Sequence, residues 1–100
     1  MRKVVTKLTI LSLLIPTISF ASSIDKAMML NEHGLKQESK AELIDVIFSK
    51  AETENKAHAY YLLGGIAFDE NKISTALDSW ITLSKKYPKS QHATLVKDRI

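Results

Sequence analysis

The sequence contains no cysteine and only two prolines and three glycines among its 100 residues. Without cysteine the chain can have no disulfide, no thiolate metal site and no cysteine nucleophile. A chain of this length forms one small domain at most and is far too short for the large α/β enzyme folds. Sustained alternation of polar and apolar residues is missing, as are Asn-Gly and Asp-Gly hairpin turns, so the sequence does not indicate β-strands.

The charges are distributed unevenly along the chain. Arg2, Lys3 and Lys7 lie in residues 1–21, which contain no acidic residue and therefore account for the whole net charge of +3. The rest of the chain is formally neutral, so its charge does not point to a nucleic acid partner. Within that part, residues 22–78 carry a net charge of −4 and residues 79–100 a net charge of +4.

Residues 1–21 have the features of a secretory signal peptide. A basic start is followed by an apolar stretch at residues 8–21, and the small residues Ser19 and Ala21 provide a cleavage site. The stretch would span about 21 Å as a helix, less than the roughly 30 Å of a bilayer core, and Pro16 interrupts it. We expect cleavage after Ala21 and a periplasmic or secreted protein. An uncleaved N-terminal anchor and a buried N-terminal helix are the alternatives.

After the leader, the apolar residues recur at helical spacing, which predicts an all-α domain of about five short helices. Ser23 or Asp25 can cap a first helix that ends at Gly34. A second helix is expected after Ser39, because Glu42 three residues later would complete a capping box with it.

The second half of the domain is predicted to hold three more helices. The polar residues 52–56 break the pattern, and a third helix is expected to follow them and to fade near Asn71. Asn71 or Ser74 can open a fourth helix, which Pro88 prevents from continuing. Ser90 is expected to start a short final helix.

The segment Ala57–Pro88 carries a spaced set of residues suited to a pair of crossing helices: Tyr60, Leu63, Gly64, Ala76, Trp80 and Pro88. Gly64 and Ala76 are small enough to let two helices approach closely, and Trp80 can fill the space beside the crossing. This set resembles the signature of the tetratricopeptide (TPR) repeat, a helix–turn–helix unit of 34 residues. The sequence departs from the family at Ala67 and Leu83, where the repeat favours Tyr and Ala.

The resemblance implies a TPR-like solenoid with three parts and a site for peptides. Residues 22–55 would be a degenerate helix pair, residues 57–88 the repeat and residues 89–100 a C-terminal capping helix. TPR arrays bind peptides on the inner face of the first helix of each pair, which here carries His58, Tyr61, Phe68 and Asp69.

Tyr61 and Phe68 are seven residues apart and are therefore expected on one side of their helix. The alternative is that the first helix pair covers both rings. The family's basic clamp for a peptide carboxylate is not supported, because the matching positions are Tyr61 and Gly65.

The residues that could support metal binding or catalysis are not grouped in the sequence. His33, His58 and His92 are far apart, and only Glu54 lies one helical turn from a histidine. The Gly64-Gly65 pair follows a predicted helix rather than a strand, so it is not a phosphate-binding loop. We expect no metal, no cofactor and no catalytic activity.

These observations favour an exported TPR-like protein-binding module that acts as an adaptor or assembly accessory in the cell envelope. Its partner would be another protein or peptide, such as part of an envelope complex. Repeat arrays usually need about three units, so we expect homo-oligomers or docking onto a larger partner. The alternative is an envelope-surface structural protein that binds an anionic membrane or wall polymer through Lys85, Lys86 and Lys89.

Overall fold

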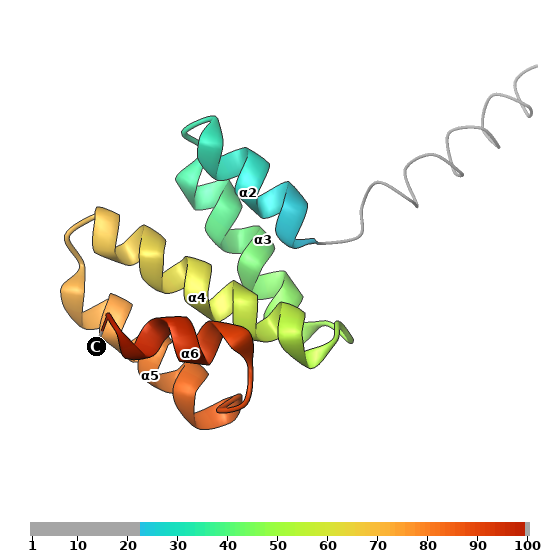
Figure 1. The fold of residues 1–100 in the computed structure, drawn as a ribbon. Helices are drawn as coiled ribbons and strands as arrows, with labels where there is room; N and C mark the ends of the chain where they lie inside the picture. The colour runs from blue at the N-terminus through green and yellow to red at the C-terminus, as the bar shows by residue number, and fades with distance from the viewer. Residues whose placement is uncertain (1–22, 100) are drawn as a thin grey trace, which may run out of the picture.

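The computed structural model describes residues 23–99, which form five helices joined by short turns (Figure 1). These are α2 (Ile24–Glu32), α3 (Lys36–Phe48), α4 (Thr53–Asp69), α5 (Ile73–Lys86) and α6 (Gln91–Lys97). No strand occurs within residues 23–99, and the prediction of an all-α domain is confirmed for this part of the chain. The predicted leader and its cleavage site after Ala21 lie outside the described residues.

Each helix packs mainly on the next one along the chain, and α6 packs on both α4 and α5. Figure 1 shows α6 lying along α4 and α5, whereas α2 lies on the other side of the domain, against α3. The buried side chains form two clusters. One joins α2, α3 and α4, and the other joins α4, α5 and α6. Because α4 belongs to both clusters, it is the central helix of the domain.

The helix ends at Ser23 and Ser90 agree with the sequence. The Ser23 hydroxyl accepts a hydrogen bond from the Lys26 amide at 3.1 Å and so caps α2. The Ser90 hydroxyl accepts one from the Ala93 amide at 3.0 Å and caps α6. Gly34 follows α2 with a φ of 79°, a left-handed conformation that glycine adopts without steric cost.

The turn between α4 and α5 uses Asn71 differently from the prediction. Asn71 has a φ of 65° and ends α4 in the left-handed region, which Asn tolerates better than most residues. It therefore does not open α5, which begins at Ile73 without a side-chain cap.

The predicted capping box of the second helix is wrong. Helix α3 begins at Lys36, one turn earlier than expected, so Ser39 lies inside the helix and is only 1% exposed. Its hydroxyl donates to the carbonyl oxygen of Ala27 at 2.7 Å and thereby links α3 to α2. Glu42 also links α3 to α2, because its carboxylate accepts a hydrogen bond from the Ser23 amide at 3.3 Å.

The third helix also begins earlier than the sequence pattern indicated. Helix α4 starts at Thr53, so the polar residues 52–56 do not separate two elements but form its first turn. Those residues are mostly exposed, and a solvated first turn needs no apolar side chain. Helix α4 therefore starts one turn before Ala57, the first residue of the predicted repeat segment.

The closest approach of α4 and α5 is at Gly64. A Cβ atom added to this glycine would lie 2.5 Å from Cδ1 and from Cε2 of Trp80, well inside contact distance. Trp80 is 2% exposed, and its indole Nε1 donates to the carbonyl oxygen of Tyr61 at 3.1 Å. The absence of a side chain at Gly64 therefore makes room for the largest residue of this cluster.

Candidate functional site

The four residues predicted to bind a partner have different neighbours around α4. His58 and Tyr61 face α6. The imidazole of His58 stacks on that of His92, with 4.1 Å between ring centroids and 17° between their planes. Tyr61 lies 5.5 Å from the His92 ring, and the Arg99 guanidinium is 5.7 Å from the Tyr61 ring. Tyr61 is thus covered by the C-terminal helix and the residue after it, not by the first helix pair.

The His58–His92 contact sets the electrostatics of the junction between α4 and α6. Burial lowers the pKa of His58 below its ordinary value of 6.5, and the neighbouring His92 lowers it further. Glu54 and Asp25 act in the opposite direction on the same pKa. Glu54 also contacts His92, with 2.8 Å between Oε2 and Nδ1. The imidazoles therefore form a packing contact between α4 and α6.

Phe68 lies near Trp80 rather than beside Tyr61. Its ring centroid is 6.1 Å from that of Trp80, and the residue is 49% exposed. Arg99 is 5.5 Å from the Trp80 ring as well, so its guanidinium contacts both Tyr61 and Trp80. Of the predicted pair, Phe68 is therefore exposed, whereas Tyr61 is half-buried beside His92 and Arg99.

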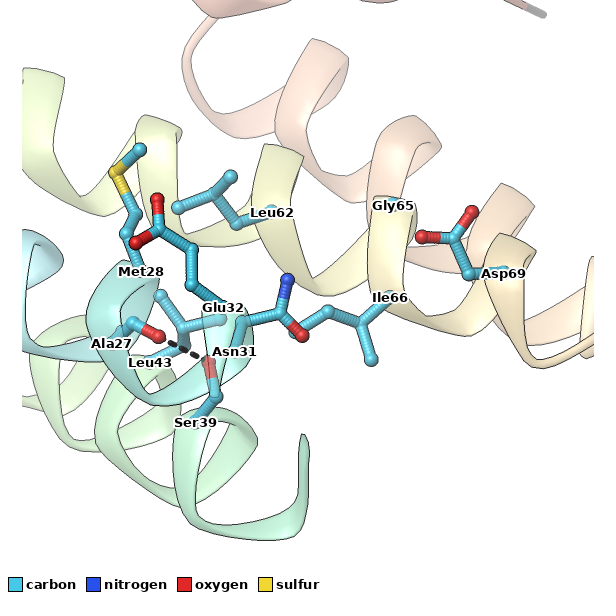
Figure 2. Close-up of a pocket in the computed structure, with 10 residues that line it drawn as sticks. All are labelled: Ala27, Met28, Asn31, Glu32, Ser39, Leu43, Leu62, Gly65, Ile66 and Asp69. Atoms are coloured by element: carbon cyan, nitrogen blue, oxygen red, sulfur yellow. Dashed lines mark hydrogen bonds between the residues drawn. The ribbon is translucent and has the colours of Figure 1, made fainter. Parts of the chain in front are cut away.

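Asp69 lines a groove between α4 and α2 (Figure 2). The groove has a volume of about 230 Å³. Its apolar lining comes from Ala27, Leu43, Leu62 and Ile66. Its polar lining includes Asn31, Glu32 and Asp69, and Figure 2 shows Asn31 between the two carboxylates. The structure thus brings together residues from α2, α3 and α4.

Gly65 is the reason why this groove is open along α4. A Cβ atom at this position would meet no heavy atom within 4 Å, in contrast to the neighbouring Gly64. The adjacent glycines therefore face different neighbours: Gly64 admits Trp80, and Gly65 leaves space in the groove beside α2. Glycine inside a helix costs about 1 kcal/mol relative to alanine, so Gly65 weakens α4 without any packing gain.

The groove is acidic at both ends. Neither Glu32 nor Asp69 forms an ion pair with any residue in the range 23–99. Each of them is the last residue of its helix, and the last turns of α2 and α4 contain no basic residue. A helix C-terminus carries a partial negative charge, which adds to that of the carboxylates.

Of the residues lining this groove, the sequence had indicated Asp69 as a binding residue, but not those that α2 contributes. Met28, Asn31 and Glu32 line the groove because the C-terminal half of α2 lies beside α4. Their i, i+3, i+4 spacing shows that they share one face of a helix, which is a signal the sequence does contain. Nothing in the sequence indicated that this face is turned toward α4.

Comparisons with known proteins find no matching family model, and no curated protein or solved structure gives a significant match. Among residues 23–99, no helix combines the length and the apolar character that crossing a membrane requires. The same part of the chain has no group of three His, Asp or Glu residues placed to hold a metal ion. The function is therefore argued from the groove itself.

Proposed function

We propose that this protein is an exported, TPR-like helical module that binds another protein or peptide in the groove between α2 and α4. It would serve as an adaptor or assembly accessory in the cell envelope, without chemistry of its own. The observation that supports this best is the open groove with an apolar floor. The resemblance adds support, because α2 and α4 correspond to the first helices of two successive pairs, which carry the peptide site in TPR arrays.

The size of the groove favours a macromolecular partner over a free small molecule. Small-molecule sites usually have volumes of about 300 to 1,000 Å³ and enclose most of the ligand. At about 230 Å³ the groove is smaller and can take only one or two side chains. A peptide segment can insert such side chains while the rest of it lies on the surface of the domain.

Gly65 provides a variant that fills the groove without disturbing the core. We expect Gly65→Leu to place its side chain into the groove, because a Cβ atom there meets no neighbour. Ala41→Leu is the matched control, since Ala41 is an exposed residue of α3 and does not line the groove. Both variants should keep the helical circular dichroism of the wild type.

The experiment is crosslinking capture of partners from the periplasm with the wild type and the two variants. We expect a partner that wild type and Ala41→Leu capture and that Gly65→Leu loses. Capture that is unchanged in Gly65→Leu would exclude this groove as the binding site. Tyr61→Ala with Phe68→Ala tests the aromatic pair that the sequence predicted, and only a loss specific to that variant would support binding through these two rings.

Export is tested on the same preparation. We expect N-terminal sequencing of the periplasmic protein to begin at Ser22, as cleavage after Ala21 requires. A protein that keeps Met1 and remains in the cytoplasm would contradict the envelope role but not the binding role of the groove.

A second candidate function rests on the basic residues near the end of α5. Lys85, Lys86 and Lys89 are exposed, and none forms an ion pair with a residue in the range 23–99. Such residues could hold the protein on an anionic membrane or wall polymer. In that case, replacing the three lysines with glutamine would abolish binding to phosphatidylglycerol vesicles, and Gly65→Leu would have no effect.

A further inference from the structure

The groove between α2 and α4 also indicates what kind of segment it selects. We propose that it binds a peptide segment in which an aliphatic side chain is flanked by lysine or arginine residues, an inference that rests on the proposed binding function. The aliphatic side chain would enter the space above Leu62 and Ile66, and the flanking cations would face Glu32 and Asp69.

The apolar floor accounts for the central side chain. Leu43, Leu62 and Ile66 line the groove from α3 and α4, and Ala27 lines it from α2. Leu43 and Ala27 are fully buried, so the floor is fixed by the core cluster beneath it. The apolar surface left open to a ligand therefore comes mainly from Leu62, which is half-buried, and from Met28, which is 40% exposed. Covering these two side chains with another apolar group is favourable. The absence of a side chain at Gly65 leaves space for that group.

The negative ends account for the flanking cations. Glu32 and Asp69 are both exposed, and three nearby lysines contact other carboxylates. Lys40 and Lys72 contact Glu70, at 2.8 and 3.6 Å. Lys26 contacts Glu42 at 3.6 Å. Neither Glu32 nor Asp69 therefore forms an ion pair within residues 23–99, and the Lys36 ammonium beside them contacts the Asn31 amide instead. The C-termini of α2 and α4 add to the negative potential of the two carboxylates.

The amide of Asn31 accounts for binding of the peptide backbone. Its Oδ1 accepts from the Lys36 ammonium at 3.4 Å, which leaves the two N–H groups of the amide as donors. Figure 2 shows this side chain between Glu32 and Asp69, where the backbone of a bound segment would pass. A carbonyl oxygen of the segment can accept from it. An acidic segment would instead meet two like charges, which disfavours its binding.

The probes are three labelled heptapeptides measured by fluorescence anisotropy on protein produced from the full-length chain. The first is Gly-Lys-Ser-Leu-Ser-Lys-Gly, the second has Glu in place of both lysines, and the third has Ser in place of leucine. The variant is Glu32→Gln with Asp69→Asn. The matched control is Glu38→Gln with Asp45→Asn, which removes the same charge from exposed positions on α3 outside the groove.

We expect the first peptide to bind the wild type about tenfold more tightly than either of the others. The groove variant should lose about tenfold in affinity for it, and the α3 control should bind it within about twofold of the wild type. Raising the salt concentration should weaken binding to the wild type more than to the groove variant.

Three results would overturn the proposal. They are equal binding of the lysine and glutamate peptides, an equal loss in the groove variant and the α3 control, and no binding of the first peptide at about 1 mM. If Gly65→Leu abolishes capture of an envelope partner while Glu32→Gln with Asp69→Asn does not, the groove binds a partner of different chemistry. If neither variant affects capture, the proposed function fails together with this inference.

Discussion

The neighbouring glycines of α4 lead to opposite predictions for the same substitution. Alanine at position 64 would place its Cβ 2.5 Å from two atoms of the Trp80 ring, and alanine at position 65 would touch nothing within 4 Å. Trp80 cannot easily move aside, because it is 2% exposed and its indole N–H is bonded to the Tyr61 carbonyl. Gly64→Ala should therefore destabilise the protein, and Gly65→Ala should stabilise it.

The magnitudes follow from three contributions to the free energy of unfolding. Replacing a mid-helix glycine with alanine raises it by about 1 kcal/mol through helix propensity alone. Forcing a methyl group into a filled site lowers it by about 1 to 3 kcal/mol. Displacing Trp80 from its hydrogen bond to Tyr61 costs about 1 kcal/mol more. We expect a net gain of about 1 kcal/mol for Gly65→Ala and a net loss of about 1 to 3 kcal/mol for Gly64→Ala.

The assay is urea unfolding of the wild type and both variants, followed by circular dichroism and by fluorescence. Trp80 is the only tryptophan of the chain, so its emission reports directly on the crossing of α4 and α5. We expect Gly64→Ala to change the native emission and Gly65→Ala to leave it unchanged. If both variants shift stability in the same direction, or if Gly64→Ala leaves stability and emission as in the wild type, Gly64 does not determine how these helices pack.

Three further predictions concern the contacts between helices. Because the pKa of His58 is lowered below 6.5, the native state binds fewer protons than the unfolded chain just below that pH, and stability should fall as the pH drops below 6.5. The melting temperature of His58→Gln should depend less on pH, between pH 7.5 and 5, than that of the wild type. An equal pH dependence of the two proteins would contradict this prediction. Ser39→Ala should lower the free energy of unfolding by about 1 kcal/mol, since it removes the bond to Ala27, and a urea midpoint equal to the wild type would refute that role. Arg99→Ala should lower the free energy of unfolding by about 1 kcal/mol in the same assay, because it removes the contact with the Trp80 ring. A urea midpoint equal to that of the wild type would show that this contact does not stabilise the protein.

The sequence predicted the helices better than their starting points. Ser23, Ser90 and Pro88 were recognised because cap and stop residues act through local chemistry, which a sequence displays directly. Ser39 was misplaced because a hydroxyl can cap a helix or link two helices, and the sequence does not distinguish these uses. Its partner is the carbonyl of Ala27, which belongs to another helix.

The candidate site was predicted only in part. The helical register correctly placed Asp69 and Gly65 together, since both line the groove. It could not show that His92 would stack on His58, because these residues lie on different helices and are 34 positions apart. The acidic groove likewise depends on how α2 is placed against α4, and local sequence patterns carry no information about that placement.

The burial patterns of α4 and α5 differ, which explains why the sequence indicated the buried face of α5 but not that of α4. The buried residues of α5 are Ala76, Trp80 and Leu83, which form a single stripe at helical spacing. Those of α4 are Ala57, Ala59, Gly64, Ile66 and Ala67, which are spread around the helix because α4 contacts helices on several sides. A helix that is apolar all round has no face that the sequence marks as inner or outer. The different neighbours of His58, Tyr61 and Asp69 are therefore a tertiary property, since α6 packs against the first two and α2 lies beside the third.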